Sequence, residues 1–423
     1  MLEKLKSSLY FPIASYFAFF ASIQLKLWHP MVIVVTGSSG KTTLLHLLES
    51  QIRENVRYSH HANSSFGIPF DILDLHRKSL IVTEWISLFI LAPVRAFKKP
   101  FAQKIYIVET DCDRPHEGKF LSKLLKPNIT LWVSSSRTHS MNFDNLVRLK
   151  RFSSVDEAIA FEYGYFLQHT KKLAIVAGEN ELIAKQFNRT NAEIHIIKKD
   201  CLNEYTPSSK GTDFVINKRN YHLPVLVPQE IFYSLSMTLS LIKYLNITAD
   251  LSFSKLTLPP GRSSLFPGIK DTTLIDSSYN ANLSSMRTII EMFVKFPAKS
   301  KWAVLGDMLE QGNEEREEHE KLADLIAAAK FNHIILMGPR VKKYTYPKLK
   351  ELLKNEHVLN VFVDPKEVLD YLNENLRGGE TVLFKGARFL EGVIEHLLTD
   401  KHNADYLCRR EKIWQIRREK WGL

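Results

Sequence analysis

Cysteine is scarce in this chain. Its 423 residues include only Cys112, Cys201 and Cys408, which lie far apart and show neither a pairing pattern nor metal-ligand spacing. This excludes a small disulfide-stapled fold and a cysteine-based metal centre. It predicts a protein of a reducing cytoplasm.

Acidic residues are also in deficit. There are 46 Asp and Glu against 57 Lys and Arg, a formal net charge of +11. A basic balance suits anionic substrates, an anionic membrane surface or nucleic acid, and does not choose among them. Because the sequence contains no arginine-finger pattern and no aromatic stacking platform, we expect no nucleic-acid partner. With 45% hydrophobic residues the chain has enough apolar material for two or three folded domains.

Charge is absent from one long stretch, between Ser7 and Leu25, which is dense in aromatic residues. Its length would just permit a membrane span, but Pro12 and several serines dilute it, and no cleavage site is apparent. We expect a hydrophobic helix over residues 1–30 that packs on the following domain. An interfacial anchor, with Lys4, Lys6 and Lys26 as its cationic flank, and a true span are the alternatives.

A strand, a small-residue loop and a helix follow at once. Val32–Val35 are four consecutive β-branched residues, the segment from Thr36 to Thr43 reads TGSSGKTT, and leucines then recur at helical spacing. Backbone N–H groups of such a loop can surround a phosphate, and Lys41 can reach the β/γ-phosphates while a threonine hydroxyl ligates Mg²⁺. We therefore predict ATP, with another nucleoside triphosphate as the alternative, and Mg²⁺ as cofactors. The predicted nucleotide-binding residues in this loop are Gly37, Ser38, Ser39, Gly40, Lys41, Thr42 and Thr43.

Two further buried strands are predicted to end at the same edge. Residues 104–111 read KIYIVETD and place Glu109 at a strand end, and residues 126–136 lead to Arg137, Thr138 and His139. Ligands collect at the carboxyl ends of parallel strands, so an acid here suits a second Mg²⁺ ligand. A lone histidine is more often a structural residue than a metal ligand. The place of His139 near a strand end makes a ligand role more plausible, but the structural role stays the favoured interpretation.

These residues together resemble a known family. The loop at 36–43, Asn63 followed by GIP at 67–69, Glu109, and KPN at 126–128 with His139 are similar to the central domain of the Mur ligases. These are ATP-dependent amide-bond ligases of cell-wall peptide assembly, and folylpolyglutamate synthetase is a relative.

The C-terminal part continues the resemblance. PPGRSS at 259–264 predicts a hinge loop. It is followed by a strand and loop at 273–286 containing YNAN, by LGDMLE at 305–310, and by KGAR at 385–388. The YNAN and LGDMLE runs are most similar to the branch of the family that adds D-alanyl-D-alanine.

The resemblance implies roles for individual residues. Family members phosphorylate a carboxylate with ATP, and an amine then displaces phosphate. It implies that Lys41 holds the β/γ-phosphates, that Thr42, Glu109 and His139 bind the metal ions, and that Arg262 and Asp276 bring the C-terminal domain onto ATP. The implied amine-binding residues are Asn280, Asn282, Asp307 and Lys385. Turn chemistry is the alternative for each of these four, because Asn and Asp are common in strand-to-helix loops.

Three departures from the family pattern stand out. Many members carry a carbamylated lysine on the helix after the histidine; here Tyr163 falls at that position, and either Glu162 supplies the carboxylate or the second metal is bound differently. The asparagine that meets adenine is replaced by Ser234. The wall-assembly ligases normally begin with a domain that binds the uridine-nucleotide end of the precursor, whereas only thirty residues precede the phosphate-loop strand here. We therefore expect that domain to be lacking.

The sequence thus predicts an α/β fold with a phosphate-loop ATPase domain at 31–257 and a smaller Rossmann-like domain at 258–423. The latter ends in a basic tail at about 400–423, where Leu407, Trp414 and Trp421 are spaced for one face of a single helix. The predicted function is ATP-dependent ligation of a carboxylate to an amino acid or dipeptide in cell-wall peptide synthesis. A ligase acting on a different carboxylate, of folylpolyglutamate or poly-amino-acid type, and a non-catalytic nucleotide-binding scaffold are the alternatives.

Overall fold

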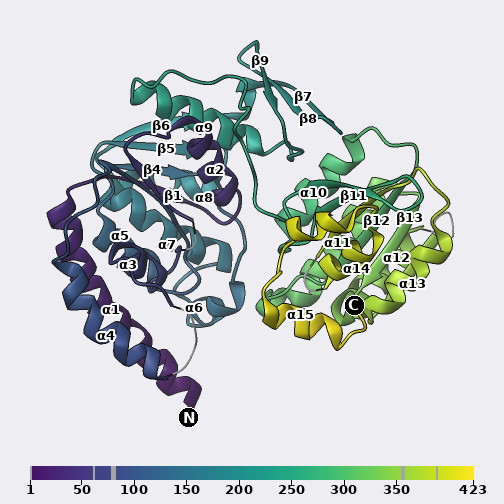
Figure 1. The fold of residues 1–423 in the computed structure, drawn as a ribbon, viewed down its shortest axis with the longest axis horizontal. Helices are drawn as coiled ribbons and strands as arrows, with labels where there is room; N and C mark the ends of the chain where they lie inside the picture. The colour runs from purple at the N-terminus through teal and green to yellow at the C-terminus, as the bar shows by residue number, and fades with distance from the viewer. Residues whose placement is uncertain (1, 61, 78–81, 354–357, 387–388) are drawn as a thin grey trace. The chain divides into compact units, whose positions relative to one another are not determined.

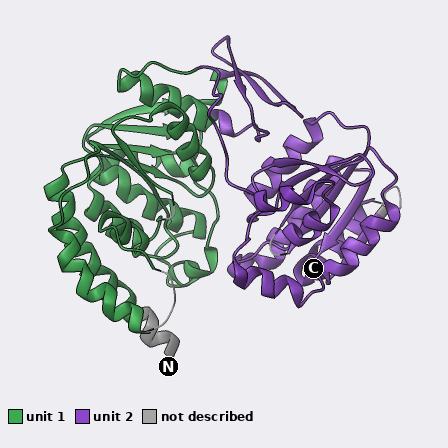
Figure 2. Cartoon of the chain, in the orientation of Figure 1, with its two compact units in different colours: residues 1–201, 233–250 green, residues 202–232, 251–423 purple. Residues whose placement is uncertain are grey.

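The computed structural model describes residues 2–60, 62–77, 82–353, 358–386 and 389–423. The chain divides into two compact units (Figure 2), one formed by residues 1–201 and 233–250, the other by residues 202–232 and 251–423. Both combine a parallel sheet with helices (Figure 1), which confirms the predicted α/β class. Ala387 and Arg388 of the last quoted motif lie outside the described residues.

Unit 1 is built on a six-stranded sheet in the order β2-β3-β1-β4-β5-β6, and every neighbouring pair is parallel. β1 is central and almost fully buried, as its run of β-branched residues predicts. Its strands are β1 Met31–Thr36, β2 Val56–Ser59, β3 Ile105–Thr110, β4 Ile129–Trp132, β5 Leu173–Ala177 and β6 Glu193–Ile197. Its helices are α1 Leu2–Trp28, α2 Lys41–Gln51, α3 Gly67–Ile72, α4 Val82–Ala96, α5 Glu117–Leu125, α6 Asp144–Arg148, α7 Val155–His169, α8 Glu181–Ala184 and α9 Ile231–Tyr244.

The hydrophobic stretch at the start of the chain is α1, which lies beside α4 (Figure 1). Phe17 is fully buried, and its ring lies 5.0 Å from that of Phe89 and 4.8 Å from that of Phe70. The Tyr16 hydroxyl donates to the Phe89 carbonyl at 2.8 Å. α1 is therefore a helix that packs on the phosphate-loop unit, as the sequence predicts. Within the described residues, no helix combines the length and apolarity needed to cross a bilayer.

Unit 2 carries a second six-stranded sheet, ordered β10-β11-β15-β12-β13-β14, in which only β10 runs antiparallel to its neighbour. Alternate residues of β12 enter two separate cores, Ala303 and Leu305 on one face and Trp302 and Val304 on the other. Its strands are β10 Ser264–Gly268, β11 Thr272–Ser277, β12 Lys301–Gly306, β13 His333–Met337, β14 Val358–Phe362 and β15 Thr381–Lys385. Its helices are α10 Leu283–Lys295, α11 Glu315–Ala329, α12 Tyr346–Leu353, α13 Pro365–Asn375, α14 Leu390–Leu397 and α15 Lys412–Glu419.

A small antiparallel sheet of β7 Leu202–Ser208, β8 Gly211–Ile216 and β9 Arg219–Leu223 completes unit 2. The tail differs from its prediction. Residues 401–406 form a 3₁₀ turn, only Lys412–Glu419 are α-helical, and Leu407 is buried outside that helix. The prediction that Leu407, Trp414 and Trp421 lie on a single helix was therefore wrong. Arg409 has φ +58°, a left-handed conformation that interrupts a helix, and its guanidinium lies 3.2 Å from the buried carboxylate of Glu391.

Candidate active site

The phosphate loop joins β1 to α2 and rests on the segment that follows β4. Gly37 has φ +135°, and a Cβ there would lie 2.8 Å from the carbonyl oxygen of Ser134. The Ser39 N–H donates to Ser134 Oγ at 2.9 Å, and the hydroxyl oxygens of Ser38 and Ser136 are 2.9 Å apart. The loop is thus fastened to the stretch that continues to Arg137, Thr138 and His139. Only glycine tolerates both this conformation and this close approach.

Lys41 opens α2 and is turned inward. Its Nζ lies 2.7 Å from Asp111 Oδ2 and donates to the Gly37 carbonyl at 2.6 Å. Burial works to lower the pKa of this ammonium, but Asp111 and Glu109 together raise it above its usual value. Lys41 is therefore a buried, charged group at the start of α2, next to the phosphate loop. Thr42 and Thr43 follow it in the first turn of α2, and the Thr43 side chain is buried.

Two aspartates and a histidine lie beside Lys41. One ligand atom from each of Asp111, Asp113 and His139 lies within 4.8 Å of the others, and His139 Nε2 is 3.2 Å from Asp113 Oδ1. Burial raises the pKa of the Asp113 carboxyl to about 6, and the neighbouring Asp111 adds to this effect. Burial also works against ionisation of Asp111, but Lys41 and His139 hold the Asp111 pKa below its usual value. Two carboxylates and an imidazole in this arrangement can hold a divalent cation.

Glu109 occupies a different place from the aspartates. It lies within β3 opposite Val35 of β1, is buried, and is close enough to Lys41 to raise the lysine pKa. The structure thus brings Glu109, Lys41 and His139 to one edge of the sheet. Its ligand role stays a prediction, since the group of three potential ligands holds Asp111 and Asp113 instead.

The two residues at the missing-lysine position have distinct contacts. The Tyr163 hydroxyl donates to Asp111 Oδ1 at 2.6 Å. The Glu162 carboxylate accepts from the backbone N–H groups of His116 at 2.8 Å and Gly118 at 3.1 Å, at the start of α5. Glu162 is therefore engaged at a helix N-terminus, so the alternative in which it supplies the missing carboxylate has no support in these contacts. Ser234, on α9, has a buried hydroxyl close to Gly40, without a hydrogen-bond partner among the described residues.

In unit 2, Asp276 and Lys385 sit at the ends of adjacent strands. Asp276 Oδ1 accepts from the Ser278 N–H at 2.9 Å and hydroxyl at 2.6 Å, whereas Oδ2 has no partner among the described residues. Lys385 Nζ donates to the carbonyls of Ser277, at 3.3 Å, and Asn280. Burial, reinforced by Arg262, lowers the Lys385 pKa to about 7. The Arg262 guanidinium lies 5.0 Å from the ring centroid of Tyr279.

The other predicted amine-binding residues have local structural contacts. Asn282 caps α10: its Oδ1 accepts from the Ser285 N–H at 2.8 Å, and its own N–H donates to Ser285 Oγ at 3.0 Å. Asp307 Oδ1 accepts from the N–H groups of Arg340 at 3.0 Å and Val341 at 2.9 Å. The Asn280 side chain accepts from the next N–H along the chain at 2.8 Å. These contacts favour turn and capping chemistry for these three residues.

Sequence reasoning missed Asp113 and the hydroxyl of Tyr163 as members of the phosphate-loop cluster. It named Glu109 as the strand-end acid and assigned no role to Asp111. The available signal was a second aspartate two positions after Asp111.

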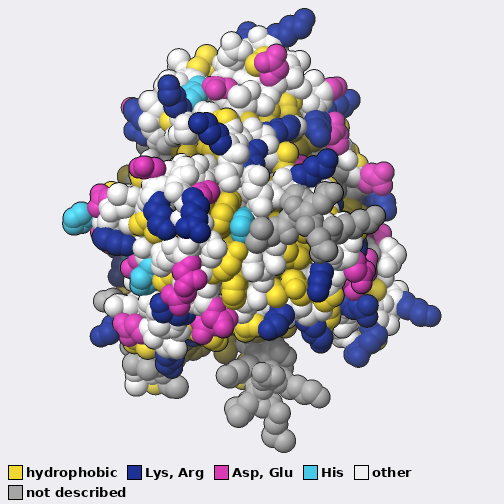
Figure 3. Space-filling model, turned by 90° about the vertical axis from the view of Figure 1, so that its right-hand side faces the viewer, with side chains coloured by type: hydrophobic (Ala, Val, Ile, Leu, Met, Phe, Trp, Pro, Cys, Tyr) yellow, Lys and Arg dark blue, Asp and Glu magenta, His cyan; other side chains and the backbone are white. Residues whose placement is uncertain are grey.

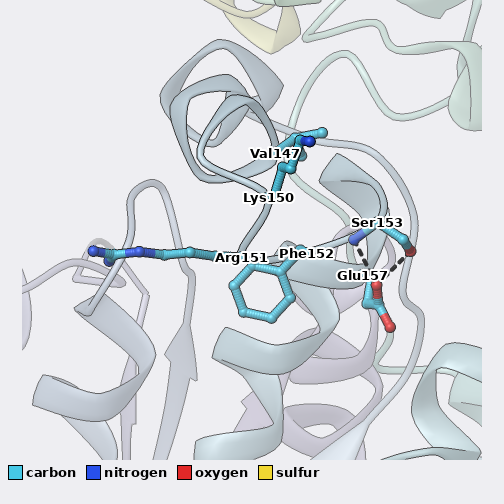
Figure 4. A pocket seen from close by; sticks show the side chains of 6 residues that line it. All are labelled: Val147, Lys150, Arg151, Phe152, Ser153 and Glu157. Carbon is cyan, nitrogen blue, oxygen red and sulfur yellow. Dashed lines mark hydrogen bonds between the residues drawn. The ribbon is translucent and has the colours of Figure 1, made fainter.

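A surface hollow in unit 1 lies between α6 and α7, lined by Val147, Lys150, Arg151, Phe152, Ser153 and Glu157. Figure 4 shows that its two basic side chains point in different directions, and that Glu157 is held by Ser153. The side chains of Lys150 and Arg151 therefore do not converge on one anion, and we assign this hollow no role.

Comparison with known proteins finds similar domains and chains. Residues 261–388 match the Mur ligase, glutamate ligase domain. UDP-N-acetylmuramoyl-tripeptide–D-alanyl-D-alanine ligase of Buchnera aphidicola is 23% identical over 392 residues, covering 88% of this chain and 76% of that protein. The Bacillus subtilis ligase of the same name is 22% identical over 382 residues, covering 87% and 76%.

Solved structures share the fold. The MurF ligase of Thermotoga maritima in complex with ADP superposes with a TM-score of 0.70 at 22% identity, covering 90% of this chain and 82% of that one. Escherichia coli FolC in complex with DHPP and ADP gives a TM-score of 0.55 at 17% identity, covering 88% and 89%.

A phosphate-loop unit followed by this C-terminal domain defines an ATP-dependent ligase that forms carbon–nitrogen bonds. Residues 261–388 match a Mur ligase domain, and over most of its length the chain is similar to ligases of that family.

Proposed function

We propose that the protein joins D-alanyl-D-alanine to the peptide carboxylate of a cell-wall precursor. The support is the relatives' shared activity together with a buried lysine, two aspartates and a histidine around a phosphate loop. The proposed functional domains run from 31 to 257 and from 258 to 423. A poly-amino-acid or folylpolyglutamate-type ligase is the second candidate, favoured by the fold shared with FolC.

The chemistry follows from the charges in unit 1. Transfer of a phosphoryl group from ATP to a carboxylate brings two anions together, so charge must be neutralised. Lys41 and the N-terminus of α2 supply positive charge at the phosphates. The amine then attacks the carbonyl carbon of the acyl phosphate: a C–N bond forms, the C–O bond to phosphate breaks, and inorganic phosphate and the amine proton are released.

Mg²⁺ is the divalent ion that these donors fit. Burial and the neighbouring Asp111 raise the pKa of the Asp113 carboxyl to about 6, and a bound cation would oppose both effects. We propose that Asp111, Asp113 and His139, together with Thr42 and Glu109, form the magnesium-binding region. Bound there, Mg²⁺ would neutralise charge on the phosphates.

The test is an assay of phosphate release with ATP, Mg²⁺ and a panel of muramoyl-peptide acids, with and without D-alanyl-D-alanine. Release that requires both acid and dipeptide supports the proposal, and Lys41→Ala is expected to lower it at least about a hundredfold. Lys119→Ala, an exposed lysine on α5, is the matched control and should keep the wild-type rate. Dependence on glutamate with a pterin or poly-amino-acid substrate would instead support the second candidate. ATP binding without any acid-dependent release would favour the scaffold alternative.

We propose further that the enzyme works in the cytoplasm with α1 and α4 resting on the membrane. The outward stripe of α4 is apolar: Ile86, Ile90 and Val94 are 56, 65 and 64% exposed. Phe97, just after the helix, is 70% exposed, and Phe19 of α1 is 61% exposed. The inward residues Ala92 and Ala96 are fully buried, so this helix is apolar on both faces. Apolar surface of this extent marks an interaction site.

Charges around this face favour anionic lipid as its occupant. Lys98 and Lys99 follow α4 and are exposed, and Lys26 is exposed near the end of α1. The carboxylate of Asp74 lies beside these cations and forms ion pairs with Arg95 at 3.1 Å and with Lys98 at 3.2 Å. A basic rim around exposed aromatic and aliphatic side chains suits the interface of an anionic bilayer.

Vesicle co-sedimentation tests this contact. The protein should pellet with phosphatidylglycerol-containing vesicles, and Ile90→Glu should reduce binding at least about tenfold, whereas Ile413→Glu on α15 should not. Sedimentation that is unaffected by Ile90→Glu, or a dimer that this variant dissociates without any vesicle binding, would overturn the membrane proposal.

A further inference from the structure

A second cluster of potential metal ligands lies in unit 1, away from the phosphate-binding groups. His46 and Glu49 are one turn apart on α2, and His60 follows β2 directly. His46 Nδ1 is 3.5 Å from Glu49 Oε2, and His60 Nε2 is 3.0 Å from Glu49 Oε1. One ligand atom from each of the three residues lies within 4.8 Å of the others.

These separations suit a tetrahedral ion. With metal–nitrogen and metal–oxygen bonds of about 2.0–2.2 Å, two ligand atoms of a tetrahedral zinc site lie about 3.3–3.5 Å apart. His46 Nδ1 and His60 Nε2 lie 3.5 and 3.0 Å from different oxygens of Glu49, close to this separation, so rotation of the side chains is needed to bring one oxygen and both nitrogens onto the ion. Two imidazoles with one carboxylate favour zinc over magnesium or calcium, whose sites are built mainly from oxygen ligands.

Neighbouring groups fix the ligands. The His60 ring stacks on Tyr58, with centroids 5.8 Å apart and planes at 24°, and the Tyr58 hydroxyl donates to the Ile52 carbonyl at 2.8 Å. The ring centroids of His46 and His60 are 5.2 Å apart. The side chains of His46, Glu49 and His60 are 17, 41 and 30% exposed, which leaves access for an ion and for a water or solute as fourth ligand.

We propose that His46, Glu49 and His60 form a zinc site that ties α2 to the end of β2. α2 begins at Lys41, and the segment beyond His60 leads to Asn63, whose carbonyl accepts from the Asp111 N–H at 2.9 Å. A metal at this cluster therefore braces two segments that carry the phosphate-loop site, without itself touching Lys41 or Asp111. The proposal is independent of the ligase substrate.

The structure offers a control for the ordinary alternative, a surface histidine–carboxylate contact. His222 Nδ1 lies 2.8 Å from Asp213 Oδ1 on β8 and β9, and this pair has no third potential ligand within reach among the described residues. A contact of that kind contributes little to stability and binds no ion tightly. His222→Ala should therefore leave zinc binding unchanged.

The experiment is a calorimetric titration of the metal-free protein with zinc chloride at pH 7.5, with Asp113→Asn included to remove the other ligand group. The Asp113→Asn variant should still bind one equivalent of zinc. The double variant that adds Glu49→Gln should lose this equivalent or bind it at least tenfold more weakly. Glu49→Gln keeps hydrogen-bonding capacity, so it should fold as the wild type does. Cobalt in place of zinc should give the intense visible absorption of a tetrahedral site.

Zinc should also raise the thermal midpoint of Asp113→Asn by several degrees, and this rise should vanish with Glu49→Gln. Equal zinc stoichiometry and equal thermal shifts with and without Glu49 would overturn the proposal. Acid-dependent phosphate release with Lys41 intact reports on the ligase separately, so the two can fail independently.

Discussion

Two buried lysines, Lys41 in unit 1 and Lys385 in unit 2, have pKa values shifted in opposite directions. Lys41 is buried beside Asp111, and its charge is stabilised. Lys385 is equally buried, but there burial and the charge of Arg262 outweigh the effect of Asp276, so the charged form is disfavoured. The same residue type therefore serves as a fixed cation in unit 1 and as a group that titrates near neutrality in unit 2.

The lowered Lys385 pKa predicts a pH dependence of stability. Its pKa is about 7 in the folded chain and about 10.5 when unfolded, so between these values the unfolded chain binds the extra proton. Stability should thus rise with pH across this window, by up to about 1.4 kcal/mol per pH unit from this residue. Urea unfolding at pH 7.5 and 9.0 should show this rise in the wild type and a smaller one in Lys385→Met.

Two roles of Asn282, capping α10 and binding the incoming amine, can be distinguished by substitution. Asn282→Ala should cost about 1 kcal/mol of stability by removing the α10 cap, whereas Asn282→Ser keeps an N-cap oxygen and should cost little. The measurement is chemical unfolding alongside the KM for the dipeptide. If Asn282→Ser keeps stability and raises that KM tenfold or more, Asn282 binds the amine, contrary to the purely structural role that its contacts favour.

At the scale of elements, α5 and α7 meet closely where Gly118 faces Glu162. A Cβ on Gly118 would lie 2.1 Å from the Glu162 backbone oxygen, which cannot move aside without shifting α7. Because α7 also carries Tyr163, this contact positions the hydroxyl on Asp111. Helix packing and site geometry are therefore linked at one glycine.

Gly118→Ala should destabilise the protein by about 2–4 kcal/mol, since the clash is with backbone in a packed interior. Lys119→Ala, at the next position and exposed, should change stability by less than about 0.5 kcal/mol. Urea unfolding of both variants is the measurement. A Gly118→Ala protein as stable as the wild type would show that α5 and α7 are not held at this distance.

The sequence predicted the features that depend on neighbouring residues in the chain, and missed those that depend on contacts between distant ones. The phosphate loop and the strands ending in acids are local patterns, and the structure places Lys41, Glu109 and His139 at one sheet edge. The link from Tyr163 to Asp111 joins residues 52 positions apart, and no local pattern specifies it. Likewise the spacing of Leu407, Trp414 and Trp421 suggested one helix, but ion pairs to Glu391 on α14 determine the path of the tail instead.

Across the whole molecule the net charge of +11 is the dominant electrostatic property. Figure 3 shows Lys and Arg scattered among acidic and apolar side chains on the face in view. A diffuse positive field attracts anionic ligands over a distance and is screened by salt. It does not select one by shape.

We therefore predict that kcat/KM for an anionic uridine-nucleotide precursor falls several-fold between 50 and 300 mM KCl, because encounter is electrostatically assisted. The value for the zwitterionic dipeptide should change little over the same range. Steady-state kinetics at fixed ATP and Mg²⁺ provides both numbers. Equal salt sensitivity of the two substrates would contradict this account.

The strand order of unit 2 has a consequence for biosynthesis. β15, the last strand to be synthesised, lies between β11 and β12, in the interior of the sheet. Until residue 385 has left the ribosome, the emerging chain presents two unpaired strand edges flanked by apolar residues. A nascent chain stalled before that point therefore needs a chaperone to keep those edges from aggregating.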